Sequence, residues 1–275
     1  MKIKLLTIHV LIISLLFYAC SGANSGNESN GNTTDAKEEV SLNDLGQQSP
    51  IYLVTSPGEM MAAFKKEAGN INWEELASFN EKTAYESDVK LALNMGIRIA
   101  DALVAVVAKD GRKLLQMSNS INEMGQSLNV GTLVDQSKKE LAGFLVDEEW
   151  DKLAAAVENL QADMQNEINT QNKKDLVELA SIGGWLEGMK IVSGHVSKNY
   201  QAENTEFLKQ AKLFDYYLEK LNKLGADTQA DPVVEEVLTA VTKLKNIMTT
   251  DSALSKEQVT QIYTISQEVV SRIEA

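Results

Sequence analysis

Apolar residues recur every three or four positions along most of the chain, which is the spacing of one face of an α-helix. Val89 and Leu93 begin one such run, and helices are expected over residues 85–108, 150–168 and 256–274. No run of alternating β-branched and polar residues bounded by turns interrupts this pattern. The three prolines all lie outside the apolar-periodic stretches. The chain is therefore predicted to be all-α.

Helix start and stop signals divide the pattern into segments. Asp231 before Pro232 is typical of a helix start, because the carboxylate caps the first turn and proline presets its φ angle. Ser255, with Gln258 three residues later, has the spacing of a capping box. Glycine adopts the left-handed conformation that often follows a helix. Helix ends are therefore expected at four glycines, namely Gly69, Gly111, Gly131 and Gly225.

Two parts of the sequence are similar to each other. Residues 89–96 and 177–184 share Val, Leu, Ala and Gly at an offset of 88, and a second group of shared positions follows, in the same order, at an offset of 84. Two such matches indicate a duplicated unit. We predict two tandem, internally duplicated helical-bundle units, 81–170 and 171–275, that form one body. Short helices are expected before them, within residues 50–80.

Small residues stand at four-residue spacing in both repeated helices, on one stripe of each. The two stripes are Ala92, Gly96 and Ala100, and Ala180, Gly184 and Gly188. Glycine inside a helix costs about 1 kcal/mol relative to alanine, so its presence needs a compensating reason. The simplest reason is the close approach of another backbone. We predict that the stripes form a helix-packing seam between the units; the alternative is that they leave room for a ligand.

The N-terminus has the pattern of an export signal. Lys2 and Lys4 precede an apolar stretch over residues 5–18. This stretch is shorter than the roughly 20 residues that a membrane-spanning helix needs. It is expected to be removed from the mature chain.

The stretch ends in Phe17-Tyr18-Ala19-Cys20, which resembles the lipobox of bacterial lipoproteins in the relaxed form seen in Bacteroidota. The resemblance implies a signal peptide over residues 1–19 and a lipid on Cys20. The alternative is an ordinary cleaved signal that happens to contain a cysteine. Cys20 is the only cysteine, so it has no partner for an intramolecular disulfide.

Residues 21–49 are rich in Ser, Gly, Asn, Thr and Gln and carry almost no apolar side chain before Val40. Such a composition does not bury enough surface to offset the entropy of ordering the chain. Residues 20–49 are therefore predicted to be the lipidated cysteine followed by a disordered tether.

The chain is acidic, with a formal net charge of −13. The first 19 residues contain two lysines and no acidic residue, so their removal changes this charge to −15. An acidic surface repels phosphate backbones and anionic headgroups. Nucleic acid is therefore excluded as a partner, and membrane contact is assigned to the N-terminal lipid.

No residue pattern points to a catalytic, cofactor-binding or metal site, and no cofactor is expected. His195 is interpreted as a structural histidine. The duplicated helical body is similar to imelysin-type lipoproteins, but their Gly-x-His-x-x-Glu motif is absent, because Ser193 and Lys198 stand at its outer positions. The acidic residues 147–149 and 235–236 are expected in the first turns of helices, where the helix dipole favours them.

The sequence thus predicts a lipid-anchored envelope protein, on the outer membrane and facing the periplasm. Its body is expected to be a non-enzymatic binding or structural module for an unknown protein or small-molecule partner. One alternative is a ligand carrier or sensor with a cleft between the two units, which a polar cluster at their junction would favour. The other is an enzyme with acidic catalytic residues, which paired carboxylates in a deep pocket would favour.

Overall fold

The structure is a computed structural model and describes residues 71, 72, 80 and 82–275. The predicted signal peptide, Cys20, the tether over 20–49 and most of the helices expected within 50–80 lie outside these residues. Every regular element in the described part of the chain is helical, and this part contains no strand. The all-α prediction is confirmed.

The described helices follow one another with short connections. They are α4 (Asp88–Ala108), α5 (Gly111–Ser127), α6 (Gly131–Val146), α7 (Trp150–Thr170), α8 (Lys174–Lys198), the 3-10 helix η2 (Ala202–Leu208), α9 (Ala211–Asn222), α10 (Ala226–Gln229), α11 (Pro232–Met248) and α12 (Lys256–Glu274).

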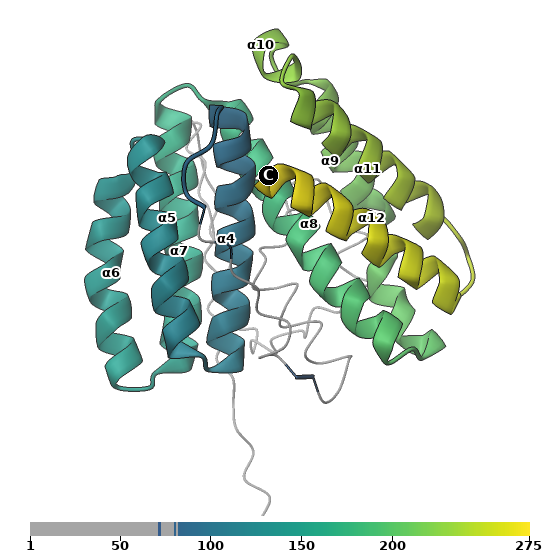
Figure 1. Cartoon of the computed structure of the whole chain (residues 1–275), viewed down its shortest axis with the longest axis horizontal. Coiled ribbons are helices and arrows are strands. Elements are labelled where there is room, and N and C mark those ends of the chain that lie inside the picture. Colours follow the sequence, from purple (N-terminus) through teal and green to yellow (C-terminus); the bar gives the residue numbers. More distant parts are fainter. Residues whose placement is uncertain (1–70, 73–79, 81) are drawn as a thin grey trace, which may run out of the picture. The chain divides into compact units, whose positions relative to one another are not determined.

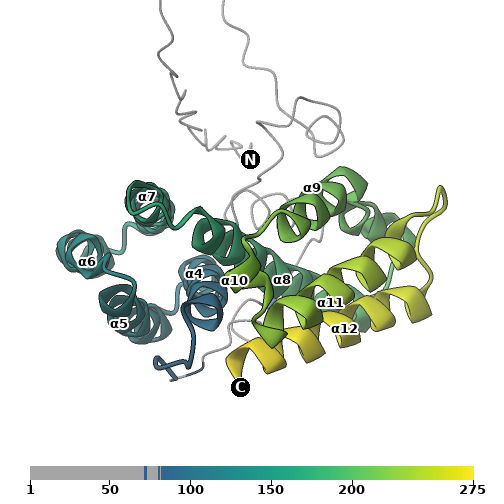
Figure 2. The ribbon, with the colours of Figure 1, turned by 90° about the horizontal axis from the view of Figure 1, so that it is seen from above.

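Two helices lie at the centre of this arrangement. The helices α4 to α7 pack on one another, and α8, α9, α11 and α12 form a second group beside them (Figure 1). The two groups meet where α8 runs along α4, which is the most extensive contact between any two described helices, and α12 also packs on α8 (Figure 2). Buried apolar side chains from both groups form one continuous core. The internal duplication of residues 81–170 and 171–275 stays a prediction.

The helices α4 and α8 are buried on nearly all sides. By length and composition α4 is able to cross a membrane, but 89% of its most apolar window is buried inside the folded body. A helix that is apolar all round is expected in the core of a large domain as well as in a membrane. The burial of α4 therefore fits a core helix.

Several helix starts follow the local signals in the sequence. The Ser87 side chain caps α4 by accepting from the Lys90 N–H at 3.1 Å. The Asp231 side chain caps α11, and Pro232 is its first residue. The capping box at the start of α12 is present in full. These contacts satisfy N–H groups that have no partner within their own helix.

The helix ends differ from expectation. Gly111 and Gly131 begin α5 and α6, and Gly225 precedes α10, so the predicted stops at these glycines are wrong. The positive φ angles belong instead to four other residues, which follow α4, α5, α6 and α7 respectively: Lys109 (57°), Asn129 (63°), Glu148 (54°) and Asn172 (60°). Asparagine tolerates this conformation, whereas it is uncommon for lysine and glutamate.

The acidic residues 147–149 also lie elsewhere than expected. Asp147 directly follows α6, Glu148 has the left-handed conformation, and Glu149 is the residue before α7. They therefore form the connection between two helices and not the first turn of one. The expectation holds for Glu235, which is in the first turn of α11.

Candidate functional site

The crossing of α4 over α8 is a contact between two backbones. A Cβ atom added to Gly96 would stand 1.8 Å from the carbonyl oxygen of Ala180 and 2.7 Å from the amide nitrogen of Gly184. A Cβ atom added to Gly183 would stand 2.1 Å from the carbonyl oxygen of Leu93. No side chain fits at such distances. The structure thus brings Gly96, Ala180 and Gly184 together and leaves no space for a ligand between them.

The remaining small residues of the two stripes, Ala92, Ala100 and Gly188, are buried as well. Gly183 belongs to neither stripe, although a Cβ atom there would also clash with a backbone atom of the other helix. The pair of adjacent glycines at 183 and 184 is the signal that could have identified it.

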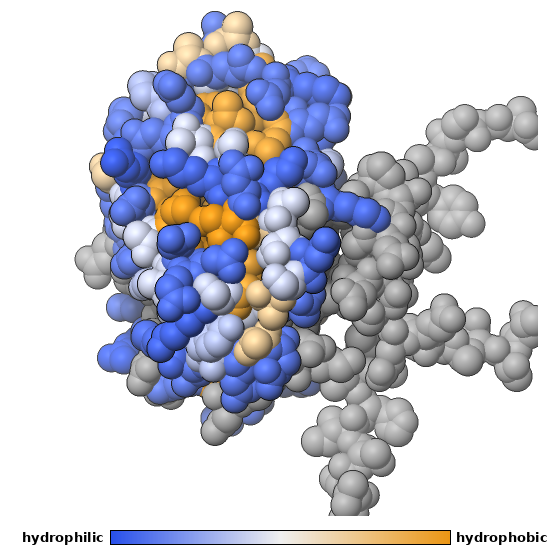
Figure 3. All heavy atoms as spheres, turned by 90° about the vertical axis from the view of Figure 1, so that its right-hand side faces the viewer, coloured by the Kyte–Doolittle hydropathy of each residue, from blue (hydrophilic) through white to orange (hydrophobic). Residues whose placement is uncertain are grey.

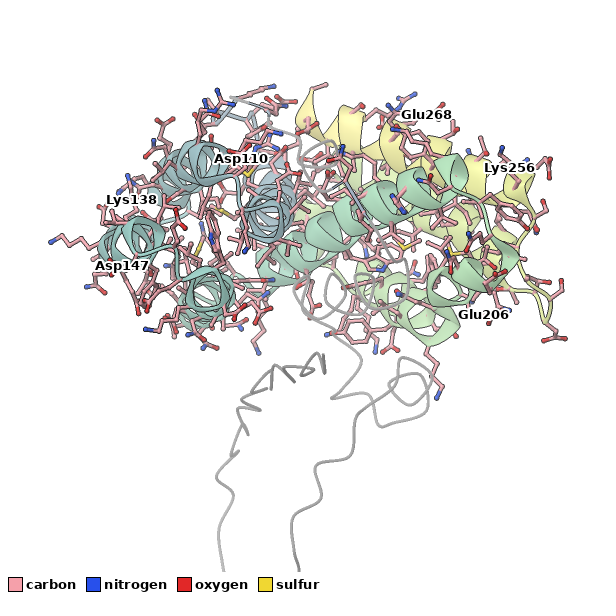
Figure 4. All side chains as sticks on the ribbon, turned by 90° about the horizontal axis from the view of Figure 1, so that it is seen from below. Asp110, Lys138, Asp147, Glu206, Lys256 and Glu268 are labelled. Atoms are coloured by element: carbon pink, nitrogen blue, oxygen red, sulfur yellow. The ribbon has the colours of Figure 1, made fainter. Side chains whose placement is uncertain are left out.

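Charged side chains gather beside this crossing, where α4, α8 and α12 meet. We call this group the junction cluster, and it consists of Arg98, Asp101, Glu187, Lys190 and Glu274. The side chains of Arg98, Asp101 and Glu187 are 0% exposed. In contrast, the charged side chains labelled in Figure 4 lie at the periphery of the helices. Removing an ion from water is unfavourable unless it is paired, so these burials need an explanation.

Ion pairs link the members of the junction cluster. The Arg98 Nη1 atom lies 2.8 Å from Glu274 Oε1 on α12 and 3.5 Å from Asp101 Oδ2 on its own helix. The Lys190 Nζ atom lies 2.6 Å from Glu187 Oε1. The cluster therefore ties α12 to α4 directly and places a separate ion pair on α8.

The Asp101 carboxyl group faces the Glu187 carboxyl group across the α4–α8 contact. Burial raises the pKa of Asp101, and the charge of Glu187 and a hydrogen bond with it raise the pKa further, while Lys190 and Arg98 act in the opposite direction. Burial lowers the pKa of Lys190, but the carboxylates of Glu187 and Asp101 outweigh burial, so its pKa is above the usual value. The surroundings therefore shift Lys190 toward its charged form and Asp101 toward its neutral form, relative to the same groups in water.

The end of α12 is held by donors from the segment that contains α4. Asn94 Nδ2 donates to the carbonyl oxygen of Ile273 at 2.8 Å. The Lys82 ammonium group donates to the carbonyl oxygen of Ala275. Carbonyl groups in the last turn of a helix have no partner within the helix and carry a partial negative charge, which donors and cations stabilise.

An aromatic group packs between α8 and α9. The Trp185 ring lies 4.9 Å from the ring of Phe214 and 5.1 Å from that of Tyr217, measured between centroids. Trp185 and Tyr217 are buried, and burial raises the pKa of the Tyr217 hydroxyl. Trp185 Nε1 donates to Gln210 Oε1 at 3.3 Å. These rings are part of the core.

His195 lies near the end of α8 and is partly exposed. Burial lowers the pKa of its imidazole, and the charge of Lys198 lowers it further. The described residues contain no group of three or more His, Cys, Asp or Glu side chains that could hold a metal ion.

Comparison of the chain with protein-family models, with curated proteins and with solved structures finds no match. Any functional conclusion therefore depends on the residues of this chain alone.

The junction cluster was not identified from the sequence. Its signal is nevertheless visible, because Asn94, Arg98 and Asp101 are polar residues on one stripe of a helix that is otherwise apolar. The polar positions of α8, Glu187 and Lys190, share the same spacing of about one turn.

Proposed function

We propose that the protein is a lipoprotein of the cell envelope whose helical body is a non-enzymatic binding or structural module. One observation gives this function of the body its strongest support. The ionised groups of the junction cluster contact one another, with Arg98 on Glu274 and Lys190 on Glu187. The Arg98–Glu274 pair joins α4 to α12, whereas a catalytic group has to reach a substrate.

The anchor in this proposal is the lipid on Cys20. Its support is the order of two lysines, a short apolar stretch and Ala19-Cys20 at the N-terminus. The acidic body favours attachment through the lipid and not through a basic face. The proposed location is the outer membrane, facing the periplasm, where the module would hold a protein or a small molecule.

A stability measurement tests the structural role of the cluster. Lys190→Met removes the cation 2.6 Å from the buried Glu187 carboxylate, and breaking such a pair costs about 3–5 kcal/mol. Lys223→Met is the control, because Lys223 pairs with Glu219 on the surface, where both side chains are more than half exposed. We expect a large fall in melting temperature for Lys190→Met and little change for the control.

The opposite result would contradict the proposal. Sites built for catalysis are often destabilising, so that removal of a catalytic group raises stability. A higher melting temperature for Lys190→Met would therefore indicate an active site.

The anchor is tested separately by labelling cells with a fatty-acid analogue. Label and membrane fractionation should both be lost in Cys20→Ala, and equal labelling of the two forms would refute lipidation.

A specific observation favours the ligand carrier as a second candidate. The Nε and Nη2 atoms of Arg98 and the Oδ1 atom of Asn94 are buried and have no hydrogen-bond partner among the described residues. Such atoms are usually satisfied by water or by a ligand. The Nε–H and Nη2–H groups of this guanidinium would donate to a carboxylate or a phosphate.

The hypothesis that the body is a ligand carrier is tested by thermal shift with acetate, succinate and phosphate. A ligand that binds the folded state raises the melting temperature in a saturable way. The carrier predicts such a rise for the wild type and its loss in Arg98→Lys, which keeps the charge and removes the fork of donors. No rise with any of the three anions would count against the carrier and leave the structural role.

A further inference from the structure

The junction cluster contains more acidic groups than basic ones. Its cations are Arg98 and Lys190, and its carboxyl groups are those of Asp101, Glu187 and Glu274. If all five were ionised, the cluster would carry one uncompensated negative charge. Arg98, Asp101 and Glu187 are wholly buried, so water does not screen that charge.

The distances show how closely a cation approaches each carboxyl group. Glu187 has Lys190 at 2.6 Å, and Glu274 has Arg98 at 2.8 Å. Asp101 is 3.5 Å from the same Arg98 nitrogen atom that Glu274 approaches more closely. Two carboxyl groups that face each other in a buried site do not both stay ionised. A single proton on Asp101 removes the repulsion and leaves two matched ion pairs.

Other groups around the cluster do not alter this balance. Tyr85, from the segment before α4, is influenced by Arg98 and Glu274, and burial raises the pKa of its hydroxyl, which keeps it neutral. The charges that act on Asp101 are those of Glu187 and Lys190 from α8 and Arg98 from α4. Glu274, from α12, acts on Lys190 and is paired with Arg98.

We infer that Asp101 holds a proton at neutral pH and donates it to Glu187, so that this shared proton locks α4 to α8, and its loss at alkaline pH loosens the junction. The inference does not depend on the proposed function. The raised pKa of Asp101 agrees with it, because burial and the Glu187 carboxylate are its main causes.

The sign of the pH dependence follows from proton binding. In the unfolded chain Asp101 ionises at its ordinary pKa of about 3.9. In the folded protein it keeps the proton above that pH, so the folded state binds one proton more than the unfolded state. The contribution of Asp101 to stability is therefore fully present at acidic pH and declines as the pH rises toward the raised folded-state pKa.

The experiment follows denaturant unfolding of the full-length protein across a pH series, for the wild type, Asp101→Asn and Asp88→Asn. The asparagine at 101 keeps a donor toward Glu187 and carries no charge at any pH. We expect the unfolding constant of the wild type to rise, relative to that of Asp101→Asn, about tenfold for each pH unit between about 3.9 and the folded-state pKa of Asp101. Asp88 lies on the same helix, with its side chain 56% exposed, and Asp88→Asn should keep the wild-type profile.

One result of this series would overturn the inference. Parallel profiles for the wild type and Asp101→Asn, with or without a constant offset, would show that Asp101 takes up no extra proton on folding. An offset in which Asp101→Asn is the less stable would be the pattern of an ionised Asp101 that pairs with Arg98.

An infrared measurement on the wild type needs no variant. At neutral pH the carbonyl stretch of a protonated carboxylic acid should be present and should shift when aspartate is labelled with ¹³C. This band should disappear at the folded-state pKa of Asp101, the pH at which the decline in stability levels off. A spectrum without a label-sensitive acid band at neutral pH would refute the shared proton, even if Asp101→Asn did not fold.

Discussion

Gly96 on α4 and Ala180 on α8 touch through their backbones, because a Cβ atom at position 96 would stand 1.8 Å from the Ala180 carbonyl oxygen. This contact sets how closely the two central helices approach. It also sets the separation of Asp101 and Glu187, which lie further along the same two helices. The close approach of the backbones and the burial of the charged cluster are therefore linked.

Gly96→Ala should destabilise the protein strongly. The added methyl group meets a backbone atom, which moves only if a whole helix moves, so the cost should exceed the 1–3 kcal/mol typical of overpacked cores. The measurement is the free energy of unfolding in denaturant.

Gly143→Ala is the matched control for that substitution. Gly143 lies inside α6, and a Cβ atom there would meet nothing within 4 Å. Alanine should stabilise the helix at this position by up to about 1 kcal/mol. If Gly96→Ala were as stable as Gly143→Ala, the two helices would not cross through their backbones.

The capping box of α12 gives a second stability prediction. The Ser255 hydroxyl accepts from the Gln258 N–H at 3.2 Å, and Gln258 Oε1 accepts from the Ser255 N–H at 2.8 Å. Ser255→Ala should cost about 1 kcal/mol. Thr264→Ala, at an exposed position of the same helix, should cost less by thermal or chemical unfolding. An equal loss for both variants would contradict the role of the cap.

Local signals in the sequence located the starts of α7, α11 and α12. The helix expected over residues 256–274 is α12 with the same bounds, because its capping box and its apolar spacing act within a few residues. The helix expected from residue 85 begins three residues later, after the Ser87 cap. These features depend on neighbouring residues, so a single sequence is enough to reveal them.

The helix ends and the junction cluster depend on contacts that local patterns do not contain. Lys109 and Asn129 take left-handed angles where glycine was expected to do so. Arg98 meets Glu274 across 176 positions of the sequence. Pairing at that separation depends on how α12 docks on α4. The apolar periodicity of each helix does not predict how two helices dock. The acidic residues were therefore interpreted as surface charge.

The composition of residues 21–49 predicts a tether that contributes nothing to the stability of the body. A chain that starts at Pro50 should melt at the same temperature as one that starts at Ser21. Thermal unfolding followed by circular dichroism makes the comparison. A difference of several degrees would show that the segment packs against the helices.

His195 should titrate below the usual histidine range. Burial and the nearby Lys198 both disfavour the charged imidazolium, so the folded-state pKa lies below the ordinary value of about 6.5. The folded protein then binds fewer protons than the unfolded chain, and the stability gained from neutral His195 is present above about pH 6.5 and is lost as the pH falls through the folded-state pKa. The imidazole resonances in NMR measure the midpoint directly, and the only other histidine, His9, lies in the predicted signal peptide. Lys198→Met should move the midpoint upward, whereas the distant Lys223→Met should leave it unchanged. A midpoint at or above the ordinary value in the wild type would mean that a group of opposite charge stabilises the imidazolium.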